Sequence, residues 1–237
     1  ESHWLQPWEC QSRKPTMSEP QSRREYIRDI ASKATKDDHP SRWFEQVYTT
    51  AERESAAIPW AQMQPNPHLL AWLNQRDRPN PAQRALVVGC GLGDDAEALA
   101  EQGYQVTAFD ISPTAIAWCQ ERFPNSSVEY QVADLFELAQ THSQAFDLVF
   151  ECRTIQALPL KVRQPTISAI CQFLAPNGTL FLITNVREDE AEPDGPPWPL
   201  SESELQQISQ QGLQEVQRHR PSGTKRPTLC LEYQRIS

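Results

Sequence analysis

The chain has 237 residues, of which 38% are hydrophobic and 22% are charged, and its formal net charge is −9. This length and composition are typical of one sizeable globular domain with an appendage, and they exclude a disordered or fibrous chain. Residues 1–80 carry 11 basic and 11 acidic side chains, whereas residues 81–237 carry 11 and 20. Because an acidic body repels phosphate backbones, we expect no nucleic-acid partner.

The apolar runs and the cysteines set further limits. No run approaches the roughly 18 apolar residues that span a bilayer, and the first residues lack the apolar region of a secretory signal. The six cysteines form no CxxC pair, and the five histidines are scattered. We therefore expect a cytoplasmic protein with reduced thiols, no metal site and no membrane partner. We also expect a monomer or weak dimer.

The front of the chain contains no glycine before Gly89 and most of the tryptophans. Residues 1–17 are predicted to be a tail, disordered or derived from an upstream extension. Residues 18–80 are predicted to form an N-terminal helical lid, with helices over 23–36 and 68–75. A further helix is expected to begin near Ser41, which we predict as its N-cap. Pro59, Pro65 and Pro67 predict an irregular segment between the last two helices.

Strands and helices alternate in residues 81–237, the predicted main domain. Strands are expected at 85–89, 105–110, 128–133, 146–151, 179–185, 213–219 and 229–236. Helices are expected at 94–102, 113–122, 165–174 and 201–211. This alternation predicts the α/β class with a doubly wound, mostly parallel sheet of seven strands and a ligand site at the carboxyl ends of the strands. The last two strands are joined by a short turn.

The segment Leu86–Ala96 places a glycine-rich turn between a buried strand and a helix. Gly89, Gly91 and Gly93 would let the backbone approach a ligand closely. Asp110 lies 17 residues beyond Gly93, at the end of the next strand, where a carboxylate is placed for the hydroxyls of a ribose. This arrangement is typical of nucleoside binding.

The turn has the spacing GxGxG, and the third glycine of a dinucleotide-binding GxGxxG would fall on Asp94. Asp94 and Asp95 also occupy the start of the helix, which a pyrophosphate needs free of carboxylates. Two acids there suit a ligand with an amino group, a sulfonium and no phosphate, as in S-adenosylmethionine. A simpler interpretation, that Asp94 is only the N-cap of the helix, stays open.

Five segments in order resemble the motifs of the Rossmann-like (class I) S-adenosylmethionine-dependent methyltransferases. They are the glycine turn, the strand end at Asp110, Val132–Phe136, Phe146–Glu151 and Leu174–Leu182. The resemblance implies an antiparallel last strand, with S-adenosylmethionine as cofactor and S-adenosylhomocysteine as product. It also implies that Asp134 meets the adenine amino group and that the next two residues flank the ring. The expected cofactor contacts are Trp43, Trp60, Gly89, Cys90, Gly91, Gly93, Asp110, Ile111, Asp134, Leu135, Phe136 and Glu151.

The front section is similar to the thiopurine, thiol and halide methyltransferase branch. The similarity lies in Trp43–Tyr48, in Ile58–Trp60 and in Gly195–Trp198. It implies that Trp43 and Trp60 close over the cofactor, although packing between front helices explains them equally well. The segment that begins at Arg153 departs from the usual residues of the branch, which leaves the acceptor open.

Methyl transfer from a sulfonium requires mainly alignment and exclusion of water, and a thiol or other soft nucleophile needs little help from a base. The leading prediction is therefore a small-molecule methyltransferase acting on such an acceptor. An alternative is O- or N-methyl transfer with Glu151 or His39 as base. Arg153, His39 and Trp198 are the candidate acceptor contacts. A NAD-dependent oxidoreductase and a binding module without catalysis remain further alternatives.

Overall fold

The computed structural model describes residues 20–34 and 40–236, with side chains from residue 25 onward. Three helices precede the sheet: α1 (Pro20–Ala34), α2 (Trp43–Thr50) and α3 (Pro67–Leu73). The other helices are α4 (Asp94–Gln102), α5 (Pro113–Arg122), α6 (Leu135–Thr141), α7 (Arg163–Gln172) and α8 (Glu202–Ser209). Short 3₁₀ turns lie at Ser55–Ala57, Ile155–Ala157 and Leu160–Val162. The predicted tail, residues 1–17, lies outside the described residues.

The strands form one sheet in the order β3-β2-β1-β4-β5-β7-β6. They are β1 (Arg84–Val88), β2 (Gln105–Asp110), β3 (Glu129–Val132), β4 (Phe146–Cys152), β5 (Leu174–Asn185), β6 (Leu213–His219) and β7 (Thr228–Arg235). Strands β1 to β5 are parallel, and β7 runs antiparallel to both β5 and β6. The predicted fold class is confirmed, including the antiparallel last strand.

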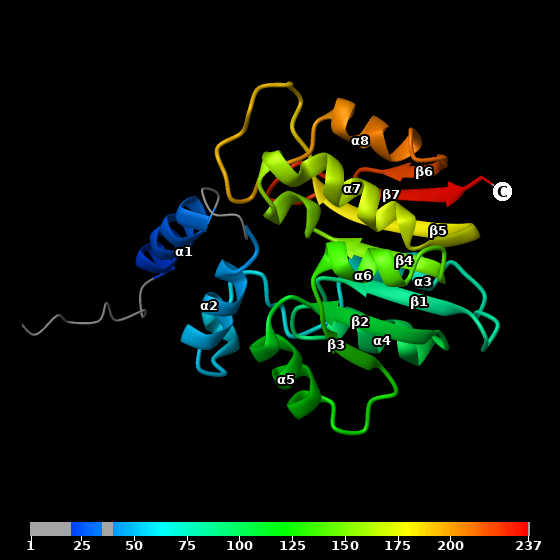
Figure 1. Cartoon of the computed structure of the whole chain (residues 1–237), viewed down its shortest axis with the longest axis horizontal. Coiled ribbons are helices and arrows are strands. Elements are labelled where there is room, and N and C mark those ends of the chain that lie inside the picture. The colour runs from blue at the N-terminus through cyan, green and yellow to red at the C-terminus, as the bar shows by residue number, and fades with distance from the viewer. Residues whose placement is uncertain (1–19, 35–39, 237) are drawn as a thin grey trace, which may run out of the picture.

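Helices cover both faces of the sheet (Figure 1). Helices α6, α7 and α8 cover one face, over a core that includes Leu86, Val149 and Leu182. Helices α3 and α4 cover the other, over a core that includes Val87 and Phe150. Neighbouring residues of a strand thus enter different cores, as the alternation of side chains across a buried parallel sheet requires.

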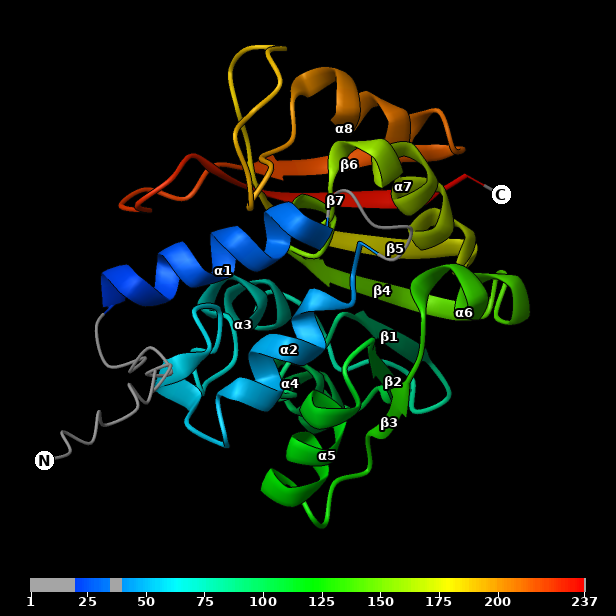
Figure 2. The same cartoon turned by 60° about the vertical axis from the view of Figure 1, so that its left-hand side comes forward.

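Helices α1 and α2 lie at the end of the sheet where the parallel strands finish (Figures 1 and 2). They bring their own apolar cluster, which includes Ile30, Trp43 and Val47, and pack it against Leu92 of the glycine turn and Trp118 of α5. Helices α1 and α2 therefore pack against the glycine turn and α5, whereas α3 belongs to the core on one face of the sheet.

Three local predictions were wrong. Ser41 is not an N-cap, because α2 begins at Trp43 and Arg42 occupies the cap position without a side-chain hydrogen bond. Helix α6 was not predicted. Strand β5 begins at Leu174, before the Pro-Asn-Gly segment that we expected to separate a helix from the strand. Residues 174–178 stay in the sheet because β5 shifts its register against β4 between Phe146 and Leu148.

Candidate active site

The glycine turn adopts a backbone conformation that only glycine takes readily. Gly91 has φ +56° and Gly93 has φ +90°. A Cβ atom on Gly91 would lie 3.3 Å from the Tyr48 hydroxyl, and one on Gly93 would lie 2.5 Å from the Tyr130 hydroxyl. The amide of Cys90 donates to the carbonyl of Phe109, at 2.9 Å, which ties the turn to β2.

Asp110 lies beside this turn and is 7% exposed. Its Oδ2 accepts a hydrogen bond from the Gly91 amide and its Oδ1 accepts one from the Ser112 amide, both at 3.0 Å. Burial raises the pKa of Asp110 to about 6, against the opposing effect of these bonds. The carboxylate is therefore fixed at the strand end, and Ile111 follows it directly.

The two acids at the start of α4 differ in their environments. Gly93, not Asp94, is the N-cap of α4, so the simpler interpretation of Asp94 was wrong. Asp94 forms a two-pronged ion pair with Arg122, at 2.7 and 2.8 Å. Asp95 instead accepts from the backbone amide of Asn66 at 2.6 Å, and burial raises its pKa to about 6. The argument against pyrophosphate therefore depends on Asp95, since Arg122 balances the charge of Asp94.

Cys90 lies in the turn beside the thiol of Cys119. A hydrogen bond with the Cys119 thiol and burial raise the pKa of Cys90 well above its usual value. The Cys119 thiol donates to the carbonyl of Gly91 at 3.2 Å. The Cys119 side chain therefore packs against the backbone of the turn.

Asp134 is the N-cap of α6, and its Oδ1 accepts from the Phe136 amide at 2.8 Å. Leu135 is 8% exposed and belongs to the core beneath α6 and α7, whereas Phe136 packs at the edge of that core. Asp134 thus stands next to β3, where the resemblance expects the adenine, but the Leu135 side chain is a core residue.

Aromatic residues of the front section form one cluster above the turn. The rings of Trp43 and Trp60 meet edge to face with centroids 5.9 Å apart, and Phe44 also contacts Trp60. The Trp60 indole donates to the Tyr48 hydroxyl at 2.8 Å. Burial, and secondarily the charge of Asp110, raise the pKa of Tyr48 well above its usual value, so its phenol stays protonated.

Tyr48 was missing from the predicted site. It lies on α2 with Trp43 and Val47, and the three share one buried face of the helix. That pattern predicts burial, but only the tertiary structure places Tyr48 against Gly91.

Glu45 anchors α2 next to Asp110. Its carboxylate accepts from the Ser112 hydroxyl and from the amide and hydroxyl of Thr114, the latter two at 3.1 and 2.6 Å. These bonds lower the pKa of Glu45, against the raising effect of burial. The front section is therefore held at the start of α5 by a charged group as well as by apolar packing.

Glu151 is fully buried near the end of β4. Its Oε1 accepts from the amides of Thr154 and Ile155, the second at 3.0 Å, and burial raises its pKa to about 7. The carboxylate therefore holds the turn that follows β4. This turn lies against the glycine turn, because the Thr154 hydroxyl donates to the carbonyl of Val88 at 3.1 Å.

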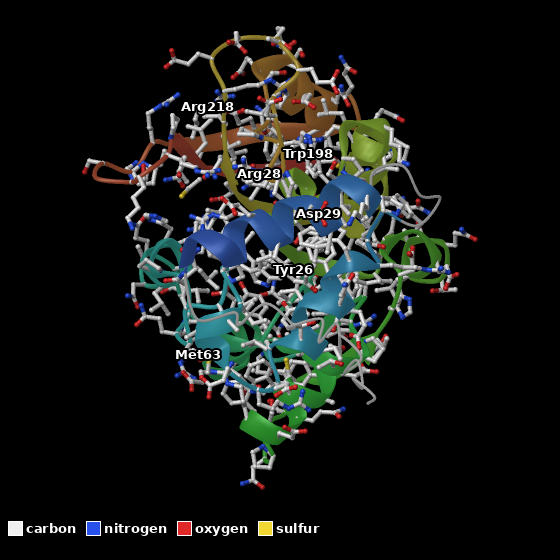
Figure 3. The ribbon with its side chains drawn as sticks, turned by 90° about the vertical axis from the view of Figure 1, so that its left-hand side faces the viewer. Tyr26, Arg28, Asp29, Met63, Trp198 and Arg218 are labelled. Atoms are coloured by element: carbon white, nitrogen blue, oxygen red, sulfur yellow. The ribbon has the colours of Figure 1, made fainter. Side chains whose placement is uncertain are left out.

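The predicted acceptor contacts differ in position. Arg153 is exposed at the end of β4, has φ +66°, and donates its amide to the carbonyl of Ile183 at 2.9 Å. Trp198 is 7% exposed, with its ring packed over Gly195; Figure 3, which looks onto this end, shows it beside α1. The indole is thus largely covered. His39 lies outside the described residues.

Asn66 is a second residue that was not predicted. Besides its amide bond to Asp95, it donates from Nδ2 to the Cys152 sulfur at 3.3 Å. Its Oδ1 accepts from the His68 amide and caps α3. The segment before α3 thus bridges the start of α4 and the end of β4. In the sequence, the flanking prolines predicted only irregular structure and not this bridge.

Within residues 20–34 and 40–236, no three His, Cys, Asp or Glu side chains are grouped so as to hold a metal ion. No helix of the same ranges combines the length and apolar character needed to cross a membrane.

The sheet order is that of the S-adenosylmethionine-dependent methyltransferase structures to which the chain is similar, and the match to a methyltransferase family confirms the predicted enzyme class. The model of the thiopurine S-methyltransferase family matches residues 50–226, and the chain belongs to this family. The match also confirms the predicted branch.

Several known proteins are similar to the chain. The "Probable thiol methyltransferase 2" of Arabidopsis thaliana is 29% identical over 158 residues, which cover 65% of this chain and 68% of that protein. The "Ubiquinone biosynthesis O-methyltransferase" of Xanthomonas campestris is 37% identical over 106 residues, or 44% of each chain. The alignment thus spans less than half the length of this second relative.

The solved structures support the fold. The N-methyltransferase NodS of Bradyrhizobium japonicum in complex with S-adenosylhomocysteine superposes with a TM-score of 0.60 at 22% identity, covering 81% of this chain and 99% of that one. The [4+2]-cyclase SpnF superposes with a TM-score of 0.66 at 17% identity, covering 83% and 96%. SpnF is named as a cyclase, so the same fold also serves other chemistry and does not by itself define the acceptor.

Proposed function

We propose that this enzyme transfers the methyl group of S-adenosylmethionine to a small thiol or another soft nucleophile. The observation that carries the proposal is the bonding of the carboxylates in the described part of the site. Asp110 is bonded to two amides, Glu151 to two and Asp95 to one. A thiol that ionises by itself needs none of them as a base, and the family match and the Arabidopsis relative agree with this acceptor class.

The residues fit the cofactor. Asp110 is a buried carboxylate beside the glycine turn, and a Cβ at Gly91 would contact Tyr48. This arrangement suits a ribose held close to the backbone. Asp134 would meet the adenine, and Trp43, Tyr48 and Trp60 would cover the nucleoside. When bound, S-adenosylmethionine supplies a methyl group activated by a sulfonium. The protein's part is to align the acceptor, keep Asp110 ionised and exclude water.

We further propose that residues 18–80 act as a lid on the domain at 81–237. Glu45, Tyr48 and Asn66 each join this section to the cofactor end of the domain, so closing it would complete the acceptor pocket. The remaining walls would be the turn at 153–159 and the segment at 188–199.

Methyl transfer from labelled S-adenosylmethionine to four probes tests the acceptor class: thiophenol, hydrosulfide, catechol and a primary alkylamine. We expect transfer to the two sulfur nucleophiles, with a rate that follows the ionised fraction of the thiol as the pH is raised. Transfer to catechol alone, with a rate that follows a group of pKa near 7, would instead favour Glu151 as base and an oxygen acceptor. Cofactor binding measured in parallel separates a wrong acceptor from a wrong cofactor.

A further inference from the structure

Ser112 lies between two carboxylates, one from the sheet and one from the front section. Its amide donates to Oδ1 of Asp110 at 3.0 Å, and its hydroxyl donates to Oε2 of Glu45. The same hydroxyl accepts from the Ala115 amide at 2.9 Å, because Ser112 is the N-cap of α5. Ser112 is fully buried. A continuous chain of hydrogen bonds therefore runs from Glu45 on α2, through Ser112, to the acid at the end of β2.

Glu45 is fixed in this contact by further hydrogen bonds. Its carboxylate accepts from the Thr114 amide at 3.1 Å and from the Thr114 hydroxyl at 2.6 Å, both in the first turn of α5. Thr49, one turn further along α2, donates to the same carboxylate at 3.0 Å. The amides and the peptide dipoles at the start of a helix also stabilise an anion there. Glu45 therefore offers the Ser112 hydroxyl an acceptor in a fixed position.

A second link joins the front section to α5 near the other end of that helix. Arg53 forms a two-pronged ion pair with Glu121, at 2.6 and 2.8 Å. The side chain of Glu121 is mostly exposed, and Arg53 is its hydrogen-bond partner among the described residues. Arg53 also donates to the carbonyl of Thr114 at 3.4 Å. The second link can therefore be cut at Glu121, but not at Arg53, without a change at the first turn of α5.

We propose that Glu45 is a positioning residue for the cofactor, which couples the docking of α2 to nucleoside binding through Ser112. The inference rests on the proposed function, because it takes Asp110 as the ligand of the ribose. Ser112, held by Glu45, presents its amide to Oδ1 of Asp110, while the Gly91 amide holds Oδ2 at 3.0 Å. Each carboxylate oxygen has a second lone pair, which is left for a ribose hydroxyl.

The coupling has a direct physical reason. Without the carboxylate of Glu45, the Ser112 hydroxyl and two donors of Thr114 lose their acceptor, which costs free energy until the turn at 111–114 rearranges. That rearrangement moves the Ser112 amide, and with it the Asp110 carboxylate, away from the direction that the ribose needs. By thermodynamic reciprocity, a bound nucleoside that fixes Asp110 also fixes Ser112 and favours the docking of α2.

Three variants test this coupling. Glu45→Gln keeps the shape of the side chain but replaces one acceptor oxygen by an amino group that cannot accept. Ser112→Ala removes the hydroxyl and keeps the amide. Glu121→Gln is the matched control, since it weakens the second link between the same two parts of the chain. Calorimetry gives the Kd for S-adenosylhomocysteine, and NMR gives amide exchange at Val47 and Tyr48 of α2 with and without this ligand.

Glu45→Gln should raise the Kd for S-adenosylhomocysteine about fivefold to tenfold, within the usual range of coupling between two sites. Ser112→Ala should raise the Kd by a similar factor, and the double variant should bind no more weakly than the weaker single variant. In the wild type, the ligand should slow exchange in α2 about fivefold to tenfold, by reciprocity. Glu45→Gln should lose most of this slowing. Glu121→Gln should keep it, with a Kd within about twofold of the wild-type value.

A wild-type Kd in Glu45→Gln would overturn the inference. So would an equal rise in Glu121→Gln, since that describes general docking of α2, and so would additive effects of Glu45→Gln and Ser112→Ala. If Ser112→Ala does not fold, the loss of ligand-induced slowing in Glu45→Gln, against its retention in Glu121→Gln, decides.

The outcome is separate from that of the proposed function. Every readout uses S-adenosylhomocysteine alone, so a wild-type enzyme that does not methylate thiophenol would refute the proposed acceptor class and leave the coupling in force. An Asp110→Ala variant that binds like the wild type would refute the ribose assignment and the coupling together. Weak binding by Asp110→Ala with wild-type binding by Glu45→Gln would refute the coupling alone.

Discussion

The indole of Trp60 donates a hydrogen bond to the hydroxyl of Tyr48, and that hydroxyl lies over the glycine turn, 3.3 Å from where a Cβ of Gly91 would be. Two aromatic residues of the front section are thus joined above the backbone that is proposed to hold the cofactor. Because Tyr48 is 2% exposed and its pKa is raised by burial and by Asp110, its phenol is a neutral group beside a carboxylate.

Tyr48→Phe should remove the acceptor of the Trp60 indole while preserving the ring. We expect a loss of about 1 kcal/mol in the free energy of unfolding, the usual worth of one hydrogen bond, and a weaker affinity for S-adenosylhomocysteine. Trp60→Phe removes the same bond from the other side. Urea unfolding of both single variants and the double variant should show effects that do not add; additive effects would mean that the two residues act independently.

Asp110→Ala should weaken binding of S-adenosylhomocysteine by roughly 2–4 kcal/mol, because charge-assisted hydrogen bonds to the ribose would be lost. Isothermal titration calorimetry measures this directly, and Glu129→Ala, an exposed acid on neighbouring β3, provides the control. An Asp110→Ala variant that binds like the wild type would contradict the assignment of the ribose site. Neither protein should bind NAD.

The raised pKa of Asp110 predicts opposite pH effects on stability and on binding. Its pKa is about 6 in the folded chain and 3.8 as the ordinary value, so the folded state holds the proton more tightly between these pH values. Ionisation of Asp110 therefore lowers the free energy of unfolding as the pH rises from about 4 to about 6. Above that pH its contribution is constant. Glu45, whose pKa is lowered, acts in the opposite direction at the acid end.

The comparison of wild type with Asp110→Asn isolates this effect. In chemical unfolding between pH 4.5 and 7.5, the free energy of unfolding of the wild type should fall with rising pH relative to that of the variant. In the wild type, affinity for S-adenosylhomocysteine should decrease below about pH 6, because ribose hydroxyls donate to the ionised carboxylate. Identical pH profiles for the two proteins would show that Asp110 does not titrate in this range.

Asp94→Asn should destabilise the fold by about 1–3 kcal/mol, because it breaks a two-pronged pair with Arg122 in which both side chains are 16% exposed. Affinity for S-adenosylhomocysteine should change little, since the pair faces α5. The exposed pair of Lys33 and Asp29 gives the contrast: Asp29→Asn should cost less than about 1 kcal/mol in thermal unfolding experiments. Equal effects of the two substitutions would be unexpected for pairs so different in burial.

Cofactor binding should order the front section. Residues 40–60 already contact Leu92 and Trp118 through Trp43 and Val47, so we expect slowed amide exchange over about 20–60 when S-adenosylhomocysteine is bound. Removal of residues 18–50 should abolish transfer and retain part of the cofactor affinity. Equal exchange in both states, together with full activity of the shortened chain, would reduce this section to packing.

The sequence by itself determined the order of the seven strands, most of the helices between them and the position of the glycine turn. These follow from local rules: a period of two or 3.6 residues, glycine where φ is positive, and an acid at a strand end. The bounds of α4, β2 and α5 agree with the prediction for the same reason. Helix α6 escaped because its seven residues are few for a helical period to show.

Only the tertiary structure decided which of the singled-out side chains face the site. Asp94 and Asp95 are neighbours in sequence, yet one is paired with Arg122, 28 positions away, and the other with the amide of Asn66. Glu151 ends its motif as predicted, but burial and two backbone amides turn its carboxylate into the following turn. The ionisation and direction of a charged group depend on partners that are distant in the chain and on the water that folding removes, and residue spacing encodes neither.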